Sequence, residues 1–320
     1  MRSRELKRML EGLGKLTPGQ RQQVLGALIV SKTAGADAAA VIEARMSPAP
    51  LCPHCAGQHV VRNGQADGLQ RYKCRGCSRT FNALCGTPLA RLRQRGKWLA
   101  QAQVLAEGLS VHQAAARLQV APSTAFRWRH RFLALPQSVK PQTLLGIAEA
   151  DETFILRSSK GQRPAGRQSR RRGGKSSTRG TSDDHVPVLV VRDRSGASTD
   201  FILRRANRAQ LAAVLAPVLA PDALLCTDGS SALAAAARQI GIAHHPLNMT
   251  SGTRVQGPWH IQNVNAYHGR LKEWMRRFHG VATSYLASYL GWFRATDRLG
   301  RLRTPPASLL ALAVGAPDHP

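Results

Sequence analysis

Acidic residues are scarce in this sequence, and this scarcity is its strongest compositional signal. The 320 residues include 46 Lys and Arg against 18 Asp and Glu, a formal net charge of +28. Between Gly68 and Ile147 the only acid is Glu107. A positive excess on this scale favours a polyanionic partner, because basic groups that neutralise phosphates release counterions. Nucleic acid is therefore the favoured partner, and an anionic membrane surface is the weaker alternative.

Long apolar runs are also lacking. No segment approaches the roughly 20 apolar residues of a membrane-spanning helix, and no apolar stretch follows the N-terminal charges as in a signal peptide. At 43% hydrophobic residues the chain can still bury a core. Four of the six cysteines form two CxxC pairs, which suits a metal site in a reducing cytosol better than a disulfide framework. We expect a cytoplasmic, nucleoid-associated protein of two or three domains, with no membrane segment.

The two CxxC pairs predict a structural zinc site. Eighteen residues separate the pair Cys52 and Cys55 from the pair Cys74 and Cys77. Each CxxC turn can aim two thiolates at one ion, and four protein thiolates fill a tetrahedral zinc shell without leaving an open position. The alternatives are an iron–sulfur cluster, which also takes four thiolates, and two unrelated pairs of buried thiols. Because two strand-like segments lie between the pairs, we expect a zinc ribbon over residues 50–86.

A helix-turn-helix is predicted over residues 87–138. Ser110 can cap a first helix with Gln113 closing a capping box, and Pro122 suits the first position of a second, basic helix. We expect Ser123, Thr124 and Arg127 to reach base edges, and Arg129 and Arg131 to meet phosphates. An ordinary helical hairpin remains the alternative, since the turn lacks the frequent glycine.

The remaining segments complete a domain plan. Residues 1–49 are expected to form a helical lead-in. From Leu144 to residue 298, short apolar strands alternate with helices, which indicates an α/β domain. A segment rich in Gly, Ser and Arg, residues 157–184, interrupts it as an expected mobile basic loop. Residues 299–320 are expected to be a peripheral tail.

Acids in strand-like settings stand out in so basic a chain. Asp151 and Glu152 are neighbours in one predicted strand, so alternation prevents both from pointing at one site. Asp228 ends a later strand, where α/β sheets place ligand sites. Each also has a simpler interpretation, because Asp228 could cap the next helix and Glu149 could be a surface strand residue.

A later segment is predicted to be a helix with two stripes. Its polar stripe consists of Asn265, His268, Lys272 and Arg276. Asn265 and Lys272 are seven residues apart, so they share a face about 10 Å apart along the axis. This face either looks onto the acids and a DNA phosphate or faces solvent.

Together these segments resemble the ISXO2-like family of zinc-ribbon-bearing DDE transposases from bacterial insertion sequences. Members of that family have an E-x-D-E-T strand motif, a T-D-G after a later strand, and an H-V-N-x-V-E motif with a Lys seven residues after the Glu. The matching segments here are residues 149–154, 227–229 and 260–265, with Lys272 at the Lys position. The resemblance covers roughly residues 50–295.

The resemblance implies an α/β RNase H-like catalytic domain behind a zinc ribbon and an all-α helix-turn-helix. It implies two-metal phosphoryl transfer, in which Asp151 and Asp228 hold two Mg²⁺ (or Mn²⁺) ions and Asn265 completes one shell. Lys272 would contact the DNA backbone near the scissile phosphate. The zinc ribbon and helix-turn-helix would recognise the element's terminal inverted repeats, and the protein would act as a homo-oligomer on double-stranded element ends and target DNA.

One position departs from the family pattern, because Asn265 stands where the third acid is usual. Its amide oxygen is a hard ligand that magnesium accepts, but it brings no charge, so metal binding there should be weaker. Three alternatives stay open: a non-catalytic zinc-ribbon helix-turn-helix regulator, a decayed transposase that still binds DNA, and another nuclease such as a resolvase. The two strand-end acids argue against the regulator, since a sensor domain does not need them.

Overall fold

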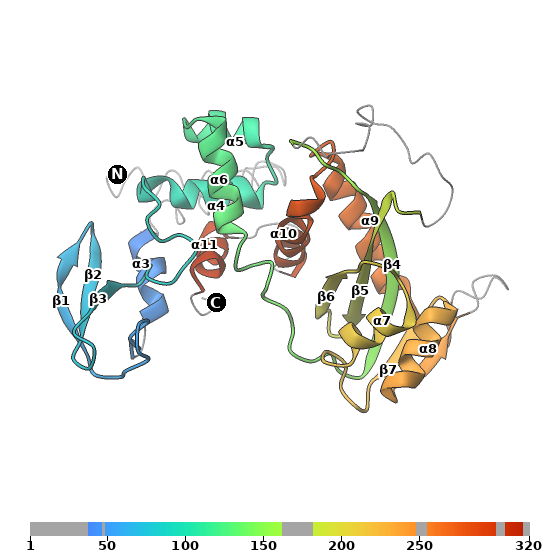
Figure 1. The fold of residues 1–320 in the computed structure, drawn as a ribbon. Coiled ribbons are helices and arrows are strands. Elements are labelled where there is room, and N and C mark those ends of the chain that lie inside the picture. Colours follow the sequence, from blue (N-terminus) through green and yellow to red (C-terminus); the bar gives the residue numbers. More distant parts are fainter. Residues whose placement is uncertain (1–37, 47–48, 162–181, 248–254, 299–304, 316–320) are drawn as a thin grey trace, which may run out of the picture. The chain divides into compact units, whose positions relative to one another are not determined.

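The computed structural model describes residues 38–46, 49–161, 182–247, 255–298 and 305–315. The first 37 residues and the centre of the expected basic insertion lie outside these ranges. The chain divides into two compact units (Figure 1). The first comprises the described parts of residues 1–109, 117–120 and 304–320, and the second comprises those of residues 110–116 and 121–303. No helix within the described ranges is long and apolar enough to cross a membrane.

A small antiparallel sheet in the first unit carries the two CxxC pairs. Its strands are β1 (Val60–Ala66), β2 (Leu69–Cys74) and β3 (Thr80–Asn82), in that order. Asp67 and Gly68 join β1 to β2 with φ values of 50° and 68°, the left-handed geometry that a two-residue hairpin turn requires. This confirms the hairpin that the sequence predicts between the cysteine pairs.

The helices of the first unit are α3 (Ala38–Glu43), α4 (Trp98–Ala106) and α11 (Pro306–Val314), with the short 3-10 helices η1 (Ala44–Met46) and η2 (Arg95–Lys97). Helix α11 packs against α3 and α4. Leu309, Leu310, Ala313 and Val314 of α11 are buried. The expectation of a peripheral tail is therefore wrong for this segment, because a helix that is apolar on all sides has to be buried.

A five-stranded mixed sheet forms the centre of the second unit. Its strands are β4 (Ile147–Leu156), β5 (His185–Asp193), β6 (Ser198–Ile202), β7 (Leu224–Thr227) and β8 (Ala243–Pro246). They lie in the order β6-β5-β4-β7-β8. Strands β4, β5 and β6 are antiparallel neighbours, whereas β7 and β8 run parallel to β4. Each of these strands lies where the sequence predicts one. A separate pair, β9 (Val255–Gln256) and β10 (Trp259–His260), precedes the next helix.

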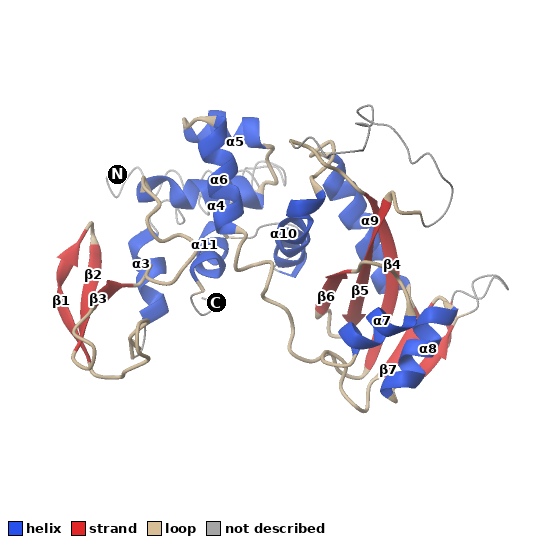
Figure 2. Ribbon diagram, viewed as in Figure 1, coloured by secondary structure: helices blue, strands red, loops and turns tan. Residues whose placement is uncertain are grey.

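Helices cover both faces of this sheet (Figure 2). Helices α7 (Arg208–Leu215) and α8 (Ser231–Ile240) cover one face, and α9 (Gln262–Arg276) and α10 (Leu286–Arg298) cover the other. Ala148 and Ala150 of β4 belong to the core under α7 and α8. Ile147 and Ile155 pack into the core under α9 and α10. Odd-numbered side chains of β4 therefore face α9, which decides where its acids point.

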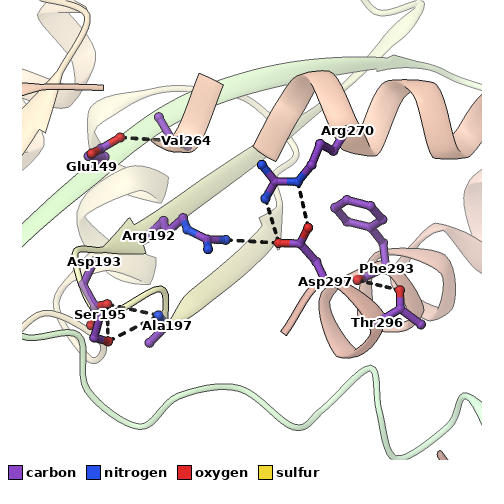
Figure 3. A network of polar contacts seen from close by, with 10 residues as sticks. All are labelled: Glu149, Arg192, Asp193, Ser195, Ala197, Val264, Arg270, Phe293, Thr296 and Asp297. Carbon is purple, nitrogen blue, oxygen red and sulfur yellow. Dashed lines mark hydrogen bonds and ion pairs between the residues drawn. The ribbon is translucent and has the colours of Figure 1, made fainter. Parts of the chain in front are cut away.

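An acid on α10 ties that helix to the sheet and to α9. Asp297 pairs with Arg192 of β5 at 3.2 Å and with Arg270 of α9 at 2.8 Å (Figure 3). Burial would raise the pKa of Asp297, but the two guanidinium groups lower it below its usual range. The carboxylate therefore stays ionised and holds α9 and α10 in a fixed relation to β5.

Helices α5 (Val111–Leu118) and α6 (Pro122–Phe132) form the predicted two helices. The Ser110 N–H donates to Oε1 of Gln113 at 2.9 Å, and the Gln113 N–H donates to Oγ of Ser110 at 3.3 Å, so the predicted capping box is present. Gln119 adopts φ of 51° in the turn, and α6 begins at Pro122 as predicted. Gln119 thus adopts the left-handed backbone conformation that glycine often adopts in such a turn.

Candidate catalytic centre and DNA-binding surfaces

Two acids belong to neighbouring parallel strands, Asp151 within β4 and Asp228 directly after β7. Strands β4 and β7 pair in the register Ile147 with Leu224 through Glu149 with Cys226. Continuing that register by two residues sets Asp151 beside Asp228, on strands about 4.8 Å apart. Because Cys226 lies in the core under α9, both acids point toward that helix.

One oxygen of each acid accepts a hydrogen bond from a backbone N–H one or two residues further along the chain. Oδ1 of Asp151 accepts the Glu152 N–H at 2.9 Å, and its Oδ2 lies 3.3 Å from Nδ1 of His268 in α9. Oδ1 of Asp228 accepts the Ser230 N–H at 3.0 Å, just before α8 begins. The suggested capping role of Asp228 is thus present only as a tight turn ahead of the helix, which involves one of its two oxygens.

Negative charge is concentrated here. Burial raises the pKa of Glu152 to about 7, and the charges of Asp151 and Asp228 raise it further in the same direction. Strand alternation still places Glu152 on the opposite face of β4 from Asp151, as the sequence predicts. The three carboxyl groups nevertheless lie close enough to repel one another, and a bound cation would relieve that repulsion.

We expect this repulsion to be measurable as a pH-dependent stability of the metal-free protein. The native state holds the Glu152 proton more tightly than the unfolded chain does, so stability falls as pH rises from about 4.5 to 7. Glu152→Gln removes the ionisation, and should raise the free energy of unfolding at pH 8 by up to roughly 3 kcal/mol while changing little at pH 4. Urea unfolding of both proteins at the two pH values measures the difference. Glu273→Gln, at an exposed acid of α9, is the control, and an equal gain for Glu152→Gln at both pH values would contradict the expectation.

Glu149 is not the surface residue that its simpler interpretation suggests, since its side chain is fully buried. Its Oε1 lies 2.9 Å from Nη1 of Arg194 and accepts a bond from the Asn263 side chain at 2.9 Å. Its Oε2 accepts the Val264 N–H at 3.0 Å, in the first turn of α9 (Figure 3). Ile261, which precedes that helix, offers no capping side chain. Glu149 therefore caps α9 from the neighbouring strand and fixes the helix against β4.

The predicted polar stripe lies on α9. Asn265 is half-buried in the first turn, His268 is buried, and Lys272 is exposed. His268 makes the contact with Asp151, although the sequence alone gave it no role beyond membership of the stripe. The signal in the sequence was its spacing of three residues from Asn265, which puts both side chains on one face of the helix. Asn265 and Lys272 flank it on the side away from the Val264 and Leu271 core.

The four cysteines of the CxxC pairs converge. Their Sγ atoms all lie within 4.8 Å of one another, with Cys52 to Cys77 and Cys55 to Cys74 both at 3.6 Å. A tetrahedral zinc site with Zn–S bonds of about 2.3 Å needs sulfurs roughly 3.8 Å apart, so the spacing fits. Among the described residues this is the only group of three or more Cys, His, Asp or Glu ligand atoms so closely spaced.

Four thiols in contact favour a bound cation. The pKa of Cys52 is lowered to about 7, because the backbone amides of His54 and Cys55 and the nearby thiols outweigh the opposing effect of burial. The pKa of Cys55 is raised to about 12 despite the Gly57 backbone amide, because the other three sulfurs surround it. One thiol ionises readily while its neighbour resists, so full ionisation of the set requires a positive ion.

The exposed face of α6 carries part of the predicted DNA contact set. Ser123, Arg127 and Arg131 are spaced four residues apart on one exposed face, and Thr124 beside them is half-buried. Arg129 points the other way and is 1% exposed. The prediction that Arg129 meets phosphate is therefore wrong, because its guanidinium is buried within the second unit.

Aromatic residues before and within α10 hold the opposite face of α6. Arg129 donates to the Tyr289 hydroxyl at 3.2 Å and lies 5.1 Å from the Trp292 ring centre. His130 stacks on Tyr285 with ring centres 4.1 Å apart. Burial lowers the pKa of His130 to about 4, with a smaller effect from the charge of Arg129, so the ring is neutral at pH 7. The guanidinium thus serves intramolecular packing.

The segment that connects α6 to β4 is bound to α10. Arg294 of α10 donates to the backbone oxygens of Pro136, Gln137 and Val139, and pairs with Asp200 of β6. A Cβ on Gly291 would collide with the backbone of Gln137, so only glycine permits this approach. Helix α6 is consequently fixed to the rest of the second unit, and residues 133–143 are not a loose linker.

Comparison with known proteins bears on these features. Residues 143–294 match the model of the ISXO2-like transposase domain, and residues 89–135 match that of a homeodomain-like domain. A protein described as uncharacterized, in transposable element ISH50 of Halobacterium salinarum, is 28% identical over 247 residues, which are 76% of this chain and 83% of that protein.

Two solved structures of Mos1 transposase are also similar. The paired-end complex with left transposon end shows a TM-score of 0.26 at 12% identity, over 68% of this chain and 74% of that chain. The pre-cleavage Mos1 transpososome shows a TM-score of 0.21 at 13% identity, over 62% and 76%. Scores of this size carry no argument, whereas the matched domains and the related transposable-element protein agree with the site described above. The matched transposase domain at residues 143–294, the matched homeodomain-like domain and the related transposable-element protein together support an insertion-sequence transposase that binds DNA.

Proposed function

We propose that this transposase binds the terminal inverted repeats of its element and cuts and joins the DNA ends at Asp151, Asp228 and Asn265. The observation that carries the proposal is the parallel pairing of β4 and β7, whose register, continued by two residues, brings Asp151 beside Asp228 on the face toward α9, which bears Asn265. We assign the RNase H-like fold to residues 144–298 on the strand order β6-β5-β4-β7-β8, in which three antiparallel strands are followed by two parallel ones.

The donor set fits hard divalent cations. Carboxylate and amide oxygens are the ligands that Mg²⁺ and Mn²⁺ prefer. The pKa of Glu152 is raised by burial and, to a smaller extent, by the negative charges of Asp151 and Asp228. Asp151 and Asp228 would hold two such ions, and Asn265 would complete one shell. Ions bound there would supply activation of the attacking water or DNA 3′-hydroxyl and stabilisation of the leaving oxygen.

The chain's own residues position the DNA. Lys272, exposed on the same stripe as Asn265, would meet the backbone phosphate near the bond that breaks. Glu149 keeps α9 in register with β4, so Asn265 and Lys272 stay aligned with Asp151. The exposed face of Ser123, Arg127 and Arg131 on α6 would enter the major groove, with Thr124 at its edge. Because α6 is fixed to the rest of the second unit, binding of α6 to the repeat would also set the distance from the repeat to the site of cleavage.

The zinc ribbon would supply a second DNA contact. Its four sulfurs fit Zn²⁺, and an ordered ribbon presents the exposed strand β1 together with Arg62 and Arg71. A ribbon and a helix-turn-helix together read a longer repeat than either alone. Acting on two element ends requires two such sets, so we propose a homo-oligomer on DNA.

The second candidate is a decayed transposase that still binds DNA. The observation that favours it is Asn265 at the position where the family usually has its third acid. The test is strand transfer in vitro, with labelled DNA carrying the native element ends and with Mg²⁺ or Mn²⁺. We expect joined products from the wild type, and more product at low metal concentration from Asn265→Asp, because a third carboxylate strengthens metal binding.

Three outcomes of this experiment separate the candidates. Products from the wild type support the proposed enzyme. Products from Asn265→Asp alone identify a relic whose third ligand has been lost. Tight end binding without products from either protein favours the non-catalytic DNA-binding regulator. Gln262→Glu, at an exposed residue in the first turn of α9 and off the stripe, is the control for adding a charge to α9.

A further inference from the structure

His268 occupies an unusual position for a histidine. It lies in α9 with 5% of its surface exposed, and its Nδ1 is 3.3 Å from Oδ2 of Asp151. Its Nε2 is buried and has no hydrogen-bond partner among the described residues. A buried polar atom without a partner is unfavourable and rare in native proteins, so its retention needs a reason.

The backbone places His268 opposite Asp151. Glu149 binds the N–H of Val264, and two residues further along β4 Asp151 meets His268, four residues further along α9. Two residues of strand advance about 6.6 Å, and four residues of helix advance about 6.0 Å. The two contacts are therefore in register, and the position of His268 is set by the strand and the helix rather than by a flexible side chain.

Packing alone does not explain an imidazole at this position. Val264 and Leu271, its neighbours on the helix surface, belong to the apolar core under α9. An aliphatic side chain would fill the same space and leave no polar atom buried without a partner. The remaining interaction of the ring is with Asp151, whose other oxygen already accepts the Glu152 N–H.

We propose that His268 is a positioning residue of the catalytic centre. Its Nδ1, 3.3 Å from Oδ2 of Asp151, and the Glu152 N–H, which donates to Oδ1, together restrain the carboxylate, whose remaining lone pairs would be free to bind a divalent ion. Carboxylate ligands of metals are commonly oriented in this way, and removing such a partner typically weakens metal binding about 10–100-fold. The inference rests on the proposed function, in which Asp151 binds the ions.

The test measures Mn²⁺ binding directly in zinc-loaded full-length protein, from the electron paramagnetic resonance signal of free Mn²⁺, without DNA or turnover. His268→Leu should weaken binding about 10–100-fold and leave the thermal midpoint of the metal-free protein equal to or above that of wild type. His268→Asn keeps a donor near the position of Nδ1 and should bind within roughly threefold of wild type. His279→Asn removes an exposed imidazole just after α9 and is the matched control.

The outcomes are distinguishable. Mn²⁺ binding by His268→Leu equal to that of wild type overturns the inference. So does a lowered thermal midpoint in His268→Leu together with weak binding in His268→Asn, because the residue would then only pack. Asp151→Ala is included to test the foundation: if it binds Mn²⁺ as tightly as wild type, the metal assignment of the proposed function is wrong, and the inference falls with it.

Discussion

Strand transfer should fall by at least roughly 10³-fold in Asp228→Ala, and equally in Asp151→Ala, while binding to the element ends is unchanged. Asp151 lies in β4 and Asp228 directly follows β7, and the parallel register of the two strands, continued by two residues, brings the acids side by side. Metal ions stabilise the charge that develops in phosphoryl transfer by several kcal/mol, and a loss of about 4 kcal/mol corresponds to about 10³ in rate. Neither side chain belongs to the exposed face of α6, so the recognition surface is not altered.

Two measurements on the same preparations check this result. Joined products from labelled ends report catalysis, and a gel-shift titration with the same ends reports binding. Asp222→Ala removes an exposed acid six residues before Asp228, and is the control for loss of one negative charge from a basic protein. Asp228→Ala protein that joins ends at more than a tenth of the wild-type rate would contradict the assignment.

Removing one cysteine of the set of four should unfold the ribbon and leave the second unit folded. Cys74 ends β2 and is fully buried, so Cys74→Ser removes one ligand from the interior of the group. Structural zinc supplies about 10–16 kcal/mol of apparent binding free energy in small zinc modules. A sheet of three short strands cannot replace that amount by burial of its own side chains.

Hydrogen exchange and metal analysis together test this expectation. In Cys74→Ser, amides of β1 and β2 should exchange as in an unfolded chain, bound zinc should fall from one ion per chain to well below one, and amides of β4 and β5 should keep their protection. Cys85→Ser, at a partly exposed cysteine outside the set, should match the wild type. Protected β1 amides in zinc-free Cys74→Ser protein would show that the ribbon folds without metal.

Local signals account for most of the elements that the sequence predicts. The CxxC spacing, the turn at Asp67 and Gly68, and the capping box at Ser110 depend on residues within a few positions of each other. The central strand β5 is a continuous apolar run, as expected of a strand covered on both faces. Helix α11 carried an equally local signal, because its apolar residues leave no polar face, and a closer examination of that pattern would have predicted its burial.

Partners distant in the chain decide what could not be predicted. Glu149 is stable as a buried acid only because Arg194 and the Val264 N–H reach it, and these lie 45 and 115 residues further along the chain. Arg127 and Arg129 look alike in the α6 sequence. Their difference arises from Tyr289, about 160 residues away, which binds one and leaves the other exposed. No periodicity within a single helix carries that information.

The packing of α11 against α3 and α4 has a consequence for synthesis on the ribosome. The first unit is built from both ends of the described chain, and the second unit is encoded between them. A nascent polypeptide can therefore complete its second unit before residues 306–314, which form α11, are available to pack against α3 and α4. Helices α3 and α4 reach their final packing only after the second unit has been translated, so a messenger truncated before α11 would yield a polypeptide whose ribbon-bearing unit lacks part of its core.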